Sequence, residues 1–272
     1  MTVYSETLLY QVESALPDKW RDRIYKARSS ITGDNAWHQD NKGFAICSLP
    51  AADQQPWLVT SLLGRDISFT PQTEPLDPVE HYRPRQRSLC TGQTVPIPVE
   101  AEEIYRFIGS VFSTSKNMNN FSPRTYPSAG GLYPVQVVVA HRNTSDLEEW
   151  ESLHYISSTN SIESLSKFTS AEMLCYIGHT DTFDPRSADF IVAYLVLPCL
   201  SIAKYGPRGY KFSLLEVGTM QESARQAGEL SGWQSRAYGY YDELGIAALF
   251  GLNPDRAWIE GLQFFGRGEV HE

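Results

Sequence analysis

The spacing of apolar and polar residues predicts a regular N-terminal segment followed by an irregular stretch. Between Thr7 and Ala27, apolar residues recur at helical spacing, which predicts an amphipathic helix. Two short apolar runs, Gly43–Leu49 and Trp57–Leu63, are typical of strands. The next stretch, Thr70–Pro84, is rich in proline, so we expect a stiff linker there.

Beyond this linker, the pattern predicts a domain of mixed helices and strands. Apolar stripes predict three helices: Pro98–Phe112, Ser213–Leu230 and Asp242–Phe250. Short apolar runs predict four strands: Val135–Ala140, Phe190–Leu197, Ser235–Tyr240 and Trp258–Phe265. The first two strands show little polar alternation, which indicates that both of their faces are covered. Helices and strands in this succession indicate a layered α+β or α/β domain.

Composition and charge exclude several classes of protein. Hydrophobic residues make up 42% of the 272 residues, enough for a core and too many for a disordered chain. The formal net charge of −9 argues against a nucleic-acid partner. Glu6 and Glu13 interrupt the N-terminus where a signal peptide needs apolar residues, and the longest apolar run, Phe190–Leu200, is too short to span a bilayer. We therefore expect a cytoplasmic protein without a membrane partner.

Several common catalytic motifs are missing from the sequence. It contains no G-x-x-x-x-G-K-[ST], G-x-G-x-x-G, G-x-S-x-G or H-E-x-x-H segment, and its six histidines lack metal-ligand spacing. These absences argue against a nucleotide triphosphatase, a Rossmann dinucleotide site and a metal site. Cys47, Cys90, Cys175 and Cys199 form no C-x-x-C pair. Their number permits two disulfides, but we expect isolated core cysteines in a reducing compartment.

The segment HYRPRQRSLCTG is a candidate anion site. Arg83, Arg85 and Arg87 lie two residues apart, so in an extended chain their guanidinium groups leave on the same side. Phosphate suits such a group because arginine donates two parallel hydrogen bonds, and Ser88 could add a hydroxyl. The alternative is an ordinary surface where these arginines pair with neighbouring acidic residues.

The segment RTYPSAGGLYP is a candidate ligand loop in front of the strand at Val135. Pro127 is followed by the small residues Ser128, Ala129, Gly130 and Gly131. Small side chains let backbone N–H groups approach a ligand closely. The alternative is a tight loop that only connects to the strand.

The segment KYGPRGYKFSLLEVG is a candidate catalytic site. Lys204 and Tyr205 are expected to follow the buried strand, and Gly206-Pro207 is expected to turn the chain. Ionisable side chains at the end of a buried strand are common in the active sites of layered proteins. The alternative is a plain turn with solvated lysine and arginine side chains.

Taken in order, these three segments resemble one family. Together with GYYD near Tyr240 and the QFFG ending at Gln263–Gly266, they are similar to the azoline (thiazoline/oxazoline) dehydrogenases of the nitroreductase-fold family. These flavin-dependent enzymes act in thiazole/oxazole-modified peptide (RiPP) biosynthesis, and the chain is most like the dehydrogenase subunit of microcin synthetases. The resemblance covers His81–Gly266.

The resemblance implies a fold, a cofactor and a reaction. The implied fold is α+β and nitroreductase-like, with a central mixed sheet flanked by helices. An N-terminal extension, residues 1–78, would dock a partner or the peptide, and residues 79–272 would form the FMN-binding domain. The implied reaction oxidises azoline rings of a ribosomally made precursor peptide to thiazoles or oxazoles. Flavin would accept hydride, and the protein would supply position and a base.

The resemblance also assigns roles to residues. Lys204 and Tyr205 match the catalytic pair: an ammonium group beside the phenol would stabilise the phenolate and make Tyr205 a feasible base. If both residues followed a strand, a kink at Gly206-Pro207 would be needed to bring them together. The implied FMN-binding residues are Arg85, Arg87 and Ser88 for the phosphate, Pro127, Ser128, Ala129, Gly130 and Gly131 for the ring, and Tyr210, Glu216, Gly218, Gly239 and Tyr240 for further contacts. Both Arg85 and Arg87 stay candidates for the main phosphate ligand.

The implied partners are a second copy of the chain and the other subunits of a synthetase complex, its cyclodehydratase and scaffold. Two alternatives belong to other classes of protein. One is an NAD(P)H-dependent nitroreductase-type flavin reductase, which would need neither the Lys204–Tyr205 pair nor the long N-terminal extension. The other is a non-catalytic scaffold of the complex that holds flavin only as a structural element.

Overall fold

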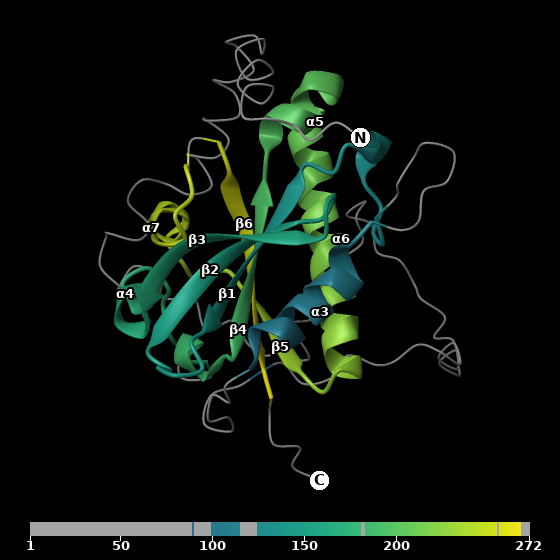
Figure 1. The fold of residues 1–272 in the computed structure, drawn as a ribbon. Coiled ribbons are helices and arrows are strands. Elements are labelled where there is room, and N and C mark those ends of the chain that lie inside the picture. The colour runs from purple at the N-terminus through teal and green to yellow at the C-terminus, as the bar shows by residue number, and fades with distance from the viewer. Residues whose placement is uncertain (1–88, 90–98, 115–123, 181–182, 255, 268–272) are drawn as a thin grey trace, which may run out of the picture. The chain divides into compact units, whose positions relative to one another are not determined.

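Six strands form one sheet in the computed structural model, which describes Leu89 and residues 99–114, 124–180, 183–254 and 256–267 (Figure 1). The strands are β1 (Val135–Arg142), β2 (Glu149–Ile156), β3 (Ser161–Thr169), β4 (Phe190–Val196), β5 (Gln234–Tyr238) and β6 (Trp258–Gly266). Their order across the sheet is β3-β2-β1-β4-β6-β5. Two predicted strands without polar alternation, β1 and β4, are therefore neighbours in the middle of the sheet.

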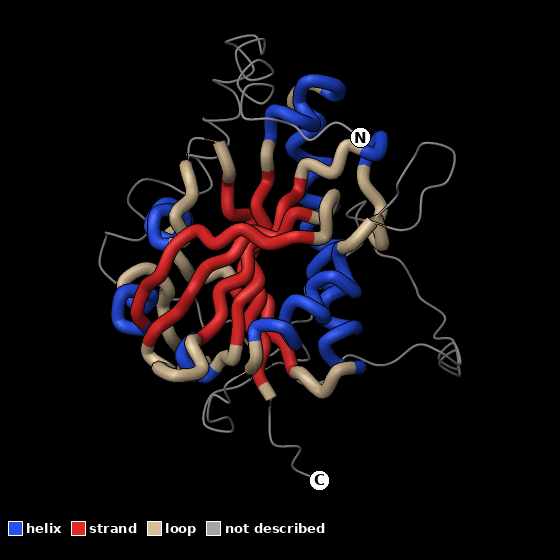
Figure 2. Tube along the Cα trace, viewed as in Figure 1, coloured by secondary structure: helices blue, strands red, loops and turns tan. Residues whose placement is uncertain are grey.

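Helices cover both faces of this sheet (Figures 1 and 2). The helices of the described residues are α3 (Ala101–Phe112), α4 (Ser170–Leu174), α5 (Pro198–Tyr205), α6 (Arg208–Leu230) and α7 (Glu243–Leu249), with short 3-10 turns η3 (Ala129–Gly131) and η4 (Pro185–Ser187). On one face lie α3 and α6, and on the other lie α4 and α7. The α+β prediction is confirmed.

The core consists of one layer on each side of the sheet. Val137 and Val139 of β1 pack with α3 and α6, whereas the intervening Val138 and Ala140 pack in the layer of α4 and α7. Successive side chains of a strand point to opposite faces, so a strand buried on both faces must be apolar throughout. Every residue of β4 is buried, in agreement with the prediction for this strand.

The prediction of a mixed sheet is wrong for the described residues. All five pairs of neighbouring strands are antiparallel. Helices between strands usually indicate parallel crossovers, and α5 and α6 do connect β4 to β5, which run parallel. The last strand, β6, inserts between these two and is antiparallel to both.

Some predicted elements differ from the observed ones, and others were not predicted. Helix α6 begins at Arg208 rather than Ser213, and β5 ends at Tyr238 rather than Tyr240. No prediction covered α4, α5 or the hairpin of β2 and β3. Strand β3 lies at the edge of the sheet and is mostly exposed, so its sequence lacks an apolar signal. Helix α5 is short and begins with Pro198. Proline is compatible with the first turn of a helix, but it does not by itself predict a helix.

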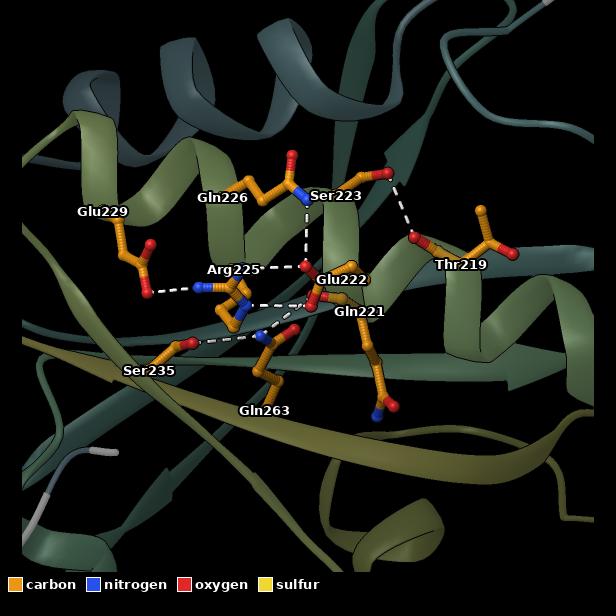
Figure 3. A network of polar contacts seen from close by, with 9 residues as sticks. All are labelled: Thr219, Gln221, Glu222, Ser223, Arg225, Gln226, Glu229, Ser235 and Gln263. Atoms are coloured by element: carbon orange, nitrogen blue, oxygen red, sulfur yellow. Dashed lines mark hydrogen bonds and ion pairs between the residues drawn. The ribbon is translucent and has the colours of Figure 1, made fainter. Parts of the chain in front are cut away.

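Helix α6 is fixed to the sheet by a polar network around Gln263 of β6 (Figure 3). The buried Gln263 amide donates to the Gln221 carbonyl oxygen at 3.1 Å and to Ser235 Oγ at 3.2 Å. Its Oε1 accepts from the Tyr194 hydroxyl at 2.6 Å. A buried amide with satisfied partners gives strong directional packing. The network therefore holds α6 in one position over β4, β5 and β6.

Other predictions fall partly or wholly outside the described residues. The predicted helix at Thr7–Ala27, the two strands after it, the linker and the domain boundary at residue 78 all lie there, and they stay predictions. Of the cysteines, Cys199 is buried as expected, whereas Cys175 is exposed. No helix in the described ranges has both the length and the apolarity needed to cross a membrane.

Candidate functional site

Two of the three candidate segments meet at one end of the sheet. Val135 at the start of β1 pairs with Val196 at the end of β4. The loop Pro127–Gly131 therefore enters the sheet where α5 leaves it, at the top of Figure 1. A backbone hydrogen bond of 2.9 Å from the Leu197 N–H to the Pro134 carbonyl oxygen joins these two connections directly.

The loop in front of β1 is a tight turn that depends on its glycines. Gly130 and Gly131 have φ angles of 64° and 66°, which residues with a Cβ rarely adopt. Ser128 closes the turn, because its carbonyl oxygen accepts from the Gly131 N–H at 3.0 Å and its Oγ accepts from the Tyr133 N–H at 2.9 Å. The run of small residues thus forms the compact turn η3 rather than an open loop.

Lys204 and Tyr205 occupy a different kind of element from the predicted one. They are the last two residues of helix α5, which ends at Gly206, and do not directly follow the strand. Neighbouring residues of a helix point about 100° apart, whereas those of a strand point to opposite faces. Both side chains therefore reach the same side without the kink that the strand model required. Lys204 also lies in the last helical turn, where a positive charge is favourable.

Gly130 brings the loop and this pair together. A Cβ atom at Gly130 would lie 2.3 Å from Tyr205 Oη and 2.7 Å from Lys204 Nζ. Both distances are below van der Waals contact, so a side chain at Gly130 would displace the ends of Tyr205 and Lys204. We call Pro127–Gly131, Lys204 and Tyr205 together the Gly130 site.

Close packing of α5 on α6 holds the catalytic candidates in place. Gly209 lies so near Ser201 that an added Cβ would be 2.4 Å from the Ser201 carbonyl carbon. The buried hydroxyls of Ser201 and Ser213 form a hydrogen bond of 2.9 Å across the same contact. Phe212 packs against Tyr205 with ring centroids 5.2 Å apart and planes at 88°. This edge-to-face contact restricts the rotation of the Tyr205 ring.

Glu216 of α6 lies under the loop and carries the most perturbed carboxyl of the site. Its side chain is 4% exposed and adjoins the Ser128 hydroxyl and the Val135 N–H. Burial raises the pKa of Glu216 to about 7, although these two hydrogen bonds and the charge of Arg124 lower it. Its Oε1 atom has no hydrogen-bond partner among the described residues. The structure thus places Glu216 behind the loop.

Arg124 and Tyr133 also belong to the site, although sequence reasoning did not single them out. The Arg124 Nη1 donates to the Tyr126 hydroxyl at 2.6 Å, and its guanidinium carbon lies 4.5 Å from the Tyr133 ring centroid. Burial raises the pKa of Tyr126 to about 12, so this phenol stays neutral. The only signal in the sequence is that both residues lie in the RTYPSAGGLYP segment, Arg124 as its first residue and Tyr133 just before its last.

Four further predicted cofactor contacts have other neighbours in the described residues. The Tyr210 hydroxyl donates to Glu260 Oε1 at 2.9 Å, and its ring packs on Trp258. Added Cβ atoms at Gly218 and Gly239 would meet no described atom within 4 Å, so both glycines border open space. Tyr240 packs on Gly178, beyond the edge strand β5.

Known proteins resemble the chain in sequence and in fold. No family model matches it. The Escherichia coli microcin B17-processing protein McbC is 25% identical over 147 residues, which are 53% of this chain and 54% of that protein. The chain thus aligns with about half the length of this curated relative.

Solved structures are similar over a larger part of the chain. A chain of the E. coli microcin synthetase McbBCD complex with truncated pro-MccB17 bound superposes with a TM-score of 0.72 and 17% identity, over 97% of this chain and 98% of that chain. A protein assigned as a nitroreductase from Ralstonia eutropha has a TM-score of 0.53 and 16% identity, over 72% and 89% of the two chains. One from Anabaena variabilis has the same two values, over 61% and 34%. The chain has the nitroreductase fold.

Within this nitroreductase fold, Leu89 and the Gly130 site lie at opposite ends of the sheet. The predicted phosphate ligands Arg85, Arg87 and Ser88 lie outside the described residues. The Leu89 N–H donates to the Ser235 carbonyl oxygen, and Leu89 packs against Gly266. Ser235 pairs with Phe265 near the end of β6, whereas the start of β6 lies at the Gly130 end. The seven residue steps between Trp258 and Phe265 correspond to about 23 Å.

No other possible site in the described residues is part of the Gly130 site. No group of three or more histidine, cysteine or acidic residues suited to a metal occurs in the ranges that the structure describes. A cavity of about 150 Å³ lies at the far end of β1, lined by His141, Arg142 and Glu151 among others. Because β1 begins at the Gly130 end, this cavity is a separate feature of the nitroreductase fold.

Proposed function

We propose that the chain is an FMN-dependent dehydrogenase that oxidises azoline rings in a ribosomally made precursor peptide to thiazoles or oxazoles. One observation carries the proposal: the Gly130 turn lies against both Lys204 and Tyr205, so closely that a side chain at Gly130 would displace them. The backbone turn therefore lies next to a candidate base, Tyr205, and a basic side chain, Lys204. The name of the relative, a microcin B17-processing protein, supports the same class of substrate.

The residues of the Gly130 site fit a flat flavin ring. Gly130 and Gly131 present bare backbone in a tight turn, which is suited to close approach by a planar ligand. FMN, when bound, would supply the acceptor for the hydride that leaves the azoline. The Ser128–Gly131 backbone would orient the ring, and Arg85, Arg87 and Ser88 would hold the phosphate.

The catalytic work of this chain would be proton removal. Tyr205, as a phenolate, would accept the proton from the azoline carbon next to the one that releases hydride. The Lys204 ammonium, 5.4 Å from the Tyr205 ring centroid, would hold the phenolate charge. Phe212 would keep the phenol in the orientation that points at the substrate.

A second copy of the chain would complete each flavin site. Helix α6 carries exposed apolar residues where a partner could pack: Leu214 is 37% and Leu215 61% exposed. Nearby Gly218 borders open space, and glycine in an exposed helix costs about 1 kcal/mol relative to alanine. A homodimer would explain both observations.

The chain would work in the cytoplasm as part of a larger synthetase. The McbBCD structure includes a truncated pro-MccB17 peptide, which supports an assembly of several subunits around a precursor peptide. In the present case the partners would be a cyclodehydratase and a scaffold subunit. Residues 1–78 would serve docking to these partners or to the peptide.

Mass spectrometry of a cyclised precursor peptide tests the proposal. We expect incubation with the FMN-loaded chain and its partner subunits to remove two hydrogens, about 2 Da, from each azoline ring. A yellow protein that leaves the mass unchanged but supports assembly of the complex would favour the scaffold function instead. Flavin reduction by NAD(P)H with turnover of quinones or nitro compounds, and no change in peptide mass, would favour the reductase function.

A further inference from the structure

Glu216 is buried at the contact between α6 and the turn η3. Its carboxyl lies next to two groups that fix the turn to β1, the Ser128 hydroxyl and the Val135 N–H. Ser128 Oγ also accepts from the Tyr133 N–H, so one hydroxyl connects the carboxyl to both ends of the turn. Because Oε1 has no hydrogen-bond partner among the described residues, the carboxyl can form one more bond than the structure records.

The charged and titratable groups around Glu216 come from one segment. Arg124 and Tyr126, both before β1, act on it electrostatically, and the Arg124 guanidinium stays in hydrogen-bond contact with Tyr126. The neighbours from β1 and η3 are a backbone N–H and a hydroxyl. Glu216 thus has hydrogen-bond donors and feels the charge of Arg124, but it forms no direct ion pair among the described residues.

We propose that Glu216 is a positioning residue: its buried carboxyl holds the Ser128–Gly131 turn on α6 and thereby sets where Gly130 meets Tyr205 and the flavin. The part about flavin rests on the proposed function. The carboxyl acts through the turn and touches neither Lys204 nor Tyr205 in this role. Loss of its proton places a negative charge under the turn and strengthens its pull on the Ser128 hydroxyl and the Val135 N–H. The position of the turn on α6 therefore depends on the charge of the Glu216 carboxyl.

The pH range in which Glu216 ionises is accessible to experiment, so its effect on the turn can be measured. Burial raises the pKa of Glu216 to about 7, so the charge changes between about pH 6 and pH 8. Glu216→Gln keeps the size and the hydrogen-bonding capacity of the side chain but cannot ionise. Glu222→Gln is a matched control on the same helix, because Glu222 is 53% exposed and pairs with Arg225 on the helix itself.

The first experiment uses the flavin-free full-length chain and measures the amide NMR signals of Gly130 and Gly131 against pH. We expect both signals to titrate with a midpoint near pH 7, about the value raised by burial, in the wild type and in Glu222→Gln. In Glu216→Gln we expect no such midpoint. If the Gly130 and Gly131 signals of the wild type do not move between about pH 6 and pH 8, the proposal is wrong, even if the variant fails to fold.

The second experiment measures FMN affinity against pH by flavin fluorescence. The phosphate of FMN itself titrates near pH 6, so the decisive quantity is the difference between variants. We expect the wild-type affinity to change at least about threefold more than that of Glu216→Gln across pH 6 to 8.5. Equal pH profiles would overturn the positioning role towards flavin. Absence of FMN binding in every variant, with the NMR titration as expected, would reject the proposed cofactor and keep the link between Glu216 and the turn.

Discussion

Gly130 and Tyr205 lie in contact through the one face of Gly130 that a side chain would occupy. A Cβ at this glycine would be 2.3 Å from Tyr205 Oη, while its φ of 64° already excludes most other residues. The same contact includes Lys204, at 2.7 Å from that Cβ position. A turn before β1 and the end of α5 thus form a single unit.

We expect Gly130→Ala to disrupt the contact between the turn before β1 and the end of α5. The added methyl group strains the backbone and displaces the Tyr205 hydroxyl, at a cost of about 1–3 kcal/mol. Turnover of azoline substrates should fall at least about tenfold, since small displacements of a base are costly. Ala129→Ser, in the same turn, adds an oxygen without a positive φ and should lose much less. Steady-state kinetics and the unfolding temperature measure both effects, and a Gly130→Ala protein with wild-type turnover would contradict the assignment.

Lys204→Ala and Tyr205→Phe should each leave a folded, yellow protein that no longer aromatises azolines. A general base contributes about 10²–10⁴-fold in rate, so the loss should be plain in an endpoint mass assay. The double variant should be no worse than either single one, because both residues act as one unit. Lys211→Ala, on the exposed side of α6, is the control. Near-normal turnover by Tyr205→Phe would remove Tyr205 as the base.

Glu216 should make the free energy of unfolding depend on pH. Its pKa is about 7 in the folded chain and 4.5 without perturbation, so between these values the folded state holds a proton that the unfolded state has released. Unfolding free energy therefore falls as pH rises from about 4.5 to about 7, by an amount on the order of 3 kcal/mol. Glu216→Gln should lack this decrease and be more stable than the wild type at about pH 8. Urea titrations at both ends of the range provide the measurement; parallel profiles would show that Glu216 is not protonated in the fold.

Arg85→Ala/Arg87→Ala should weaken FMN binding without changing the catalytic pair. Removing charged partners of a phosphate costs on the order of 2–3 kcal/mol, or about a 30- to 150-fold loss of affinity. Arg186→Ala is the control, because Arg186 pairs with Asp184 at the surface. Fluorescence titration with FMN gives both affinities. Unchanged flavin occupancy in the double variant would show that the phosphate binds elsewhere.

Mixing two inactive variants should restore activity if each flavin site uses two chains. Arg85→Ala/Arg87→Ala lacks the phosphate end, and Gly130→Ala lacks the turn. In a mixed dimer both lesions fall on one site, and the other site is intact. Equal mixing with subunit exchange should therefore recover about a quarter of the wild-type activity. No recovery, with light scattering showing mixed dimers, would place both ends of the site in one chain.

Local pattern was sufficient for the elements whose environment is uniform. Strand β4 is buried throughout and α7 is capped by Asp242, whose side chain accepts from the Leu244 N–H, so composition and cap residues predict both. The resemblance of three short segments also indicated the fold and the residues that meet at Gly130. These features depend on neighbours in sequence or on short motifs.

Tertiary structure decided the features that depend on distant segments. Insertion of β6 between β4 and β5 makes the sheet antiparallel, and no local pattern records which strand will insert. The edge position of β3 makes it polar, and α5 is a helix because it packs on α6 through Gly209 and Ser201. In the sequence, Glu216 is indistinguishable from the other glutamates of an amphipathic helix. In the folded chain the turn covers it and excludes water, and this burial raises the pKa of its carboxyl.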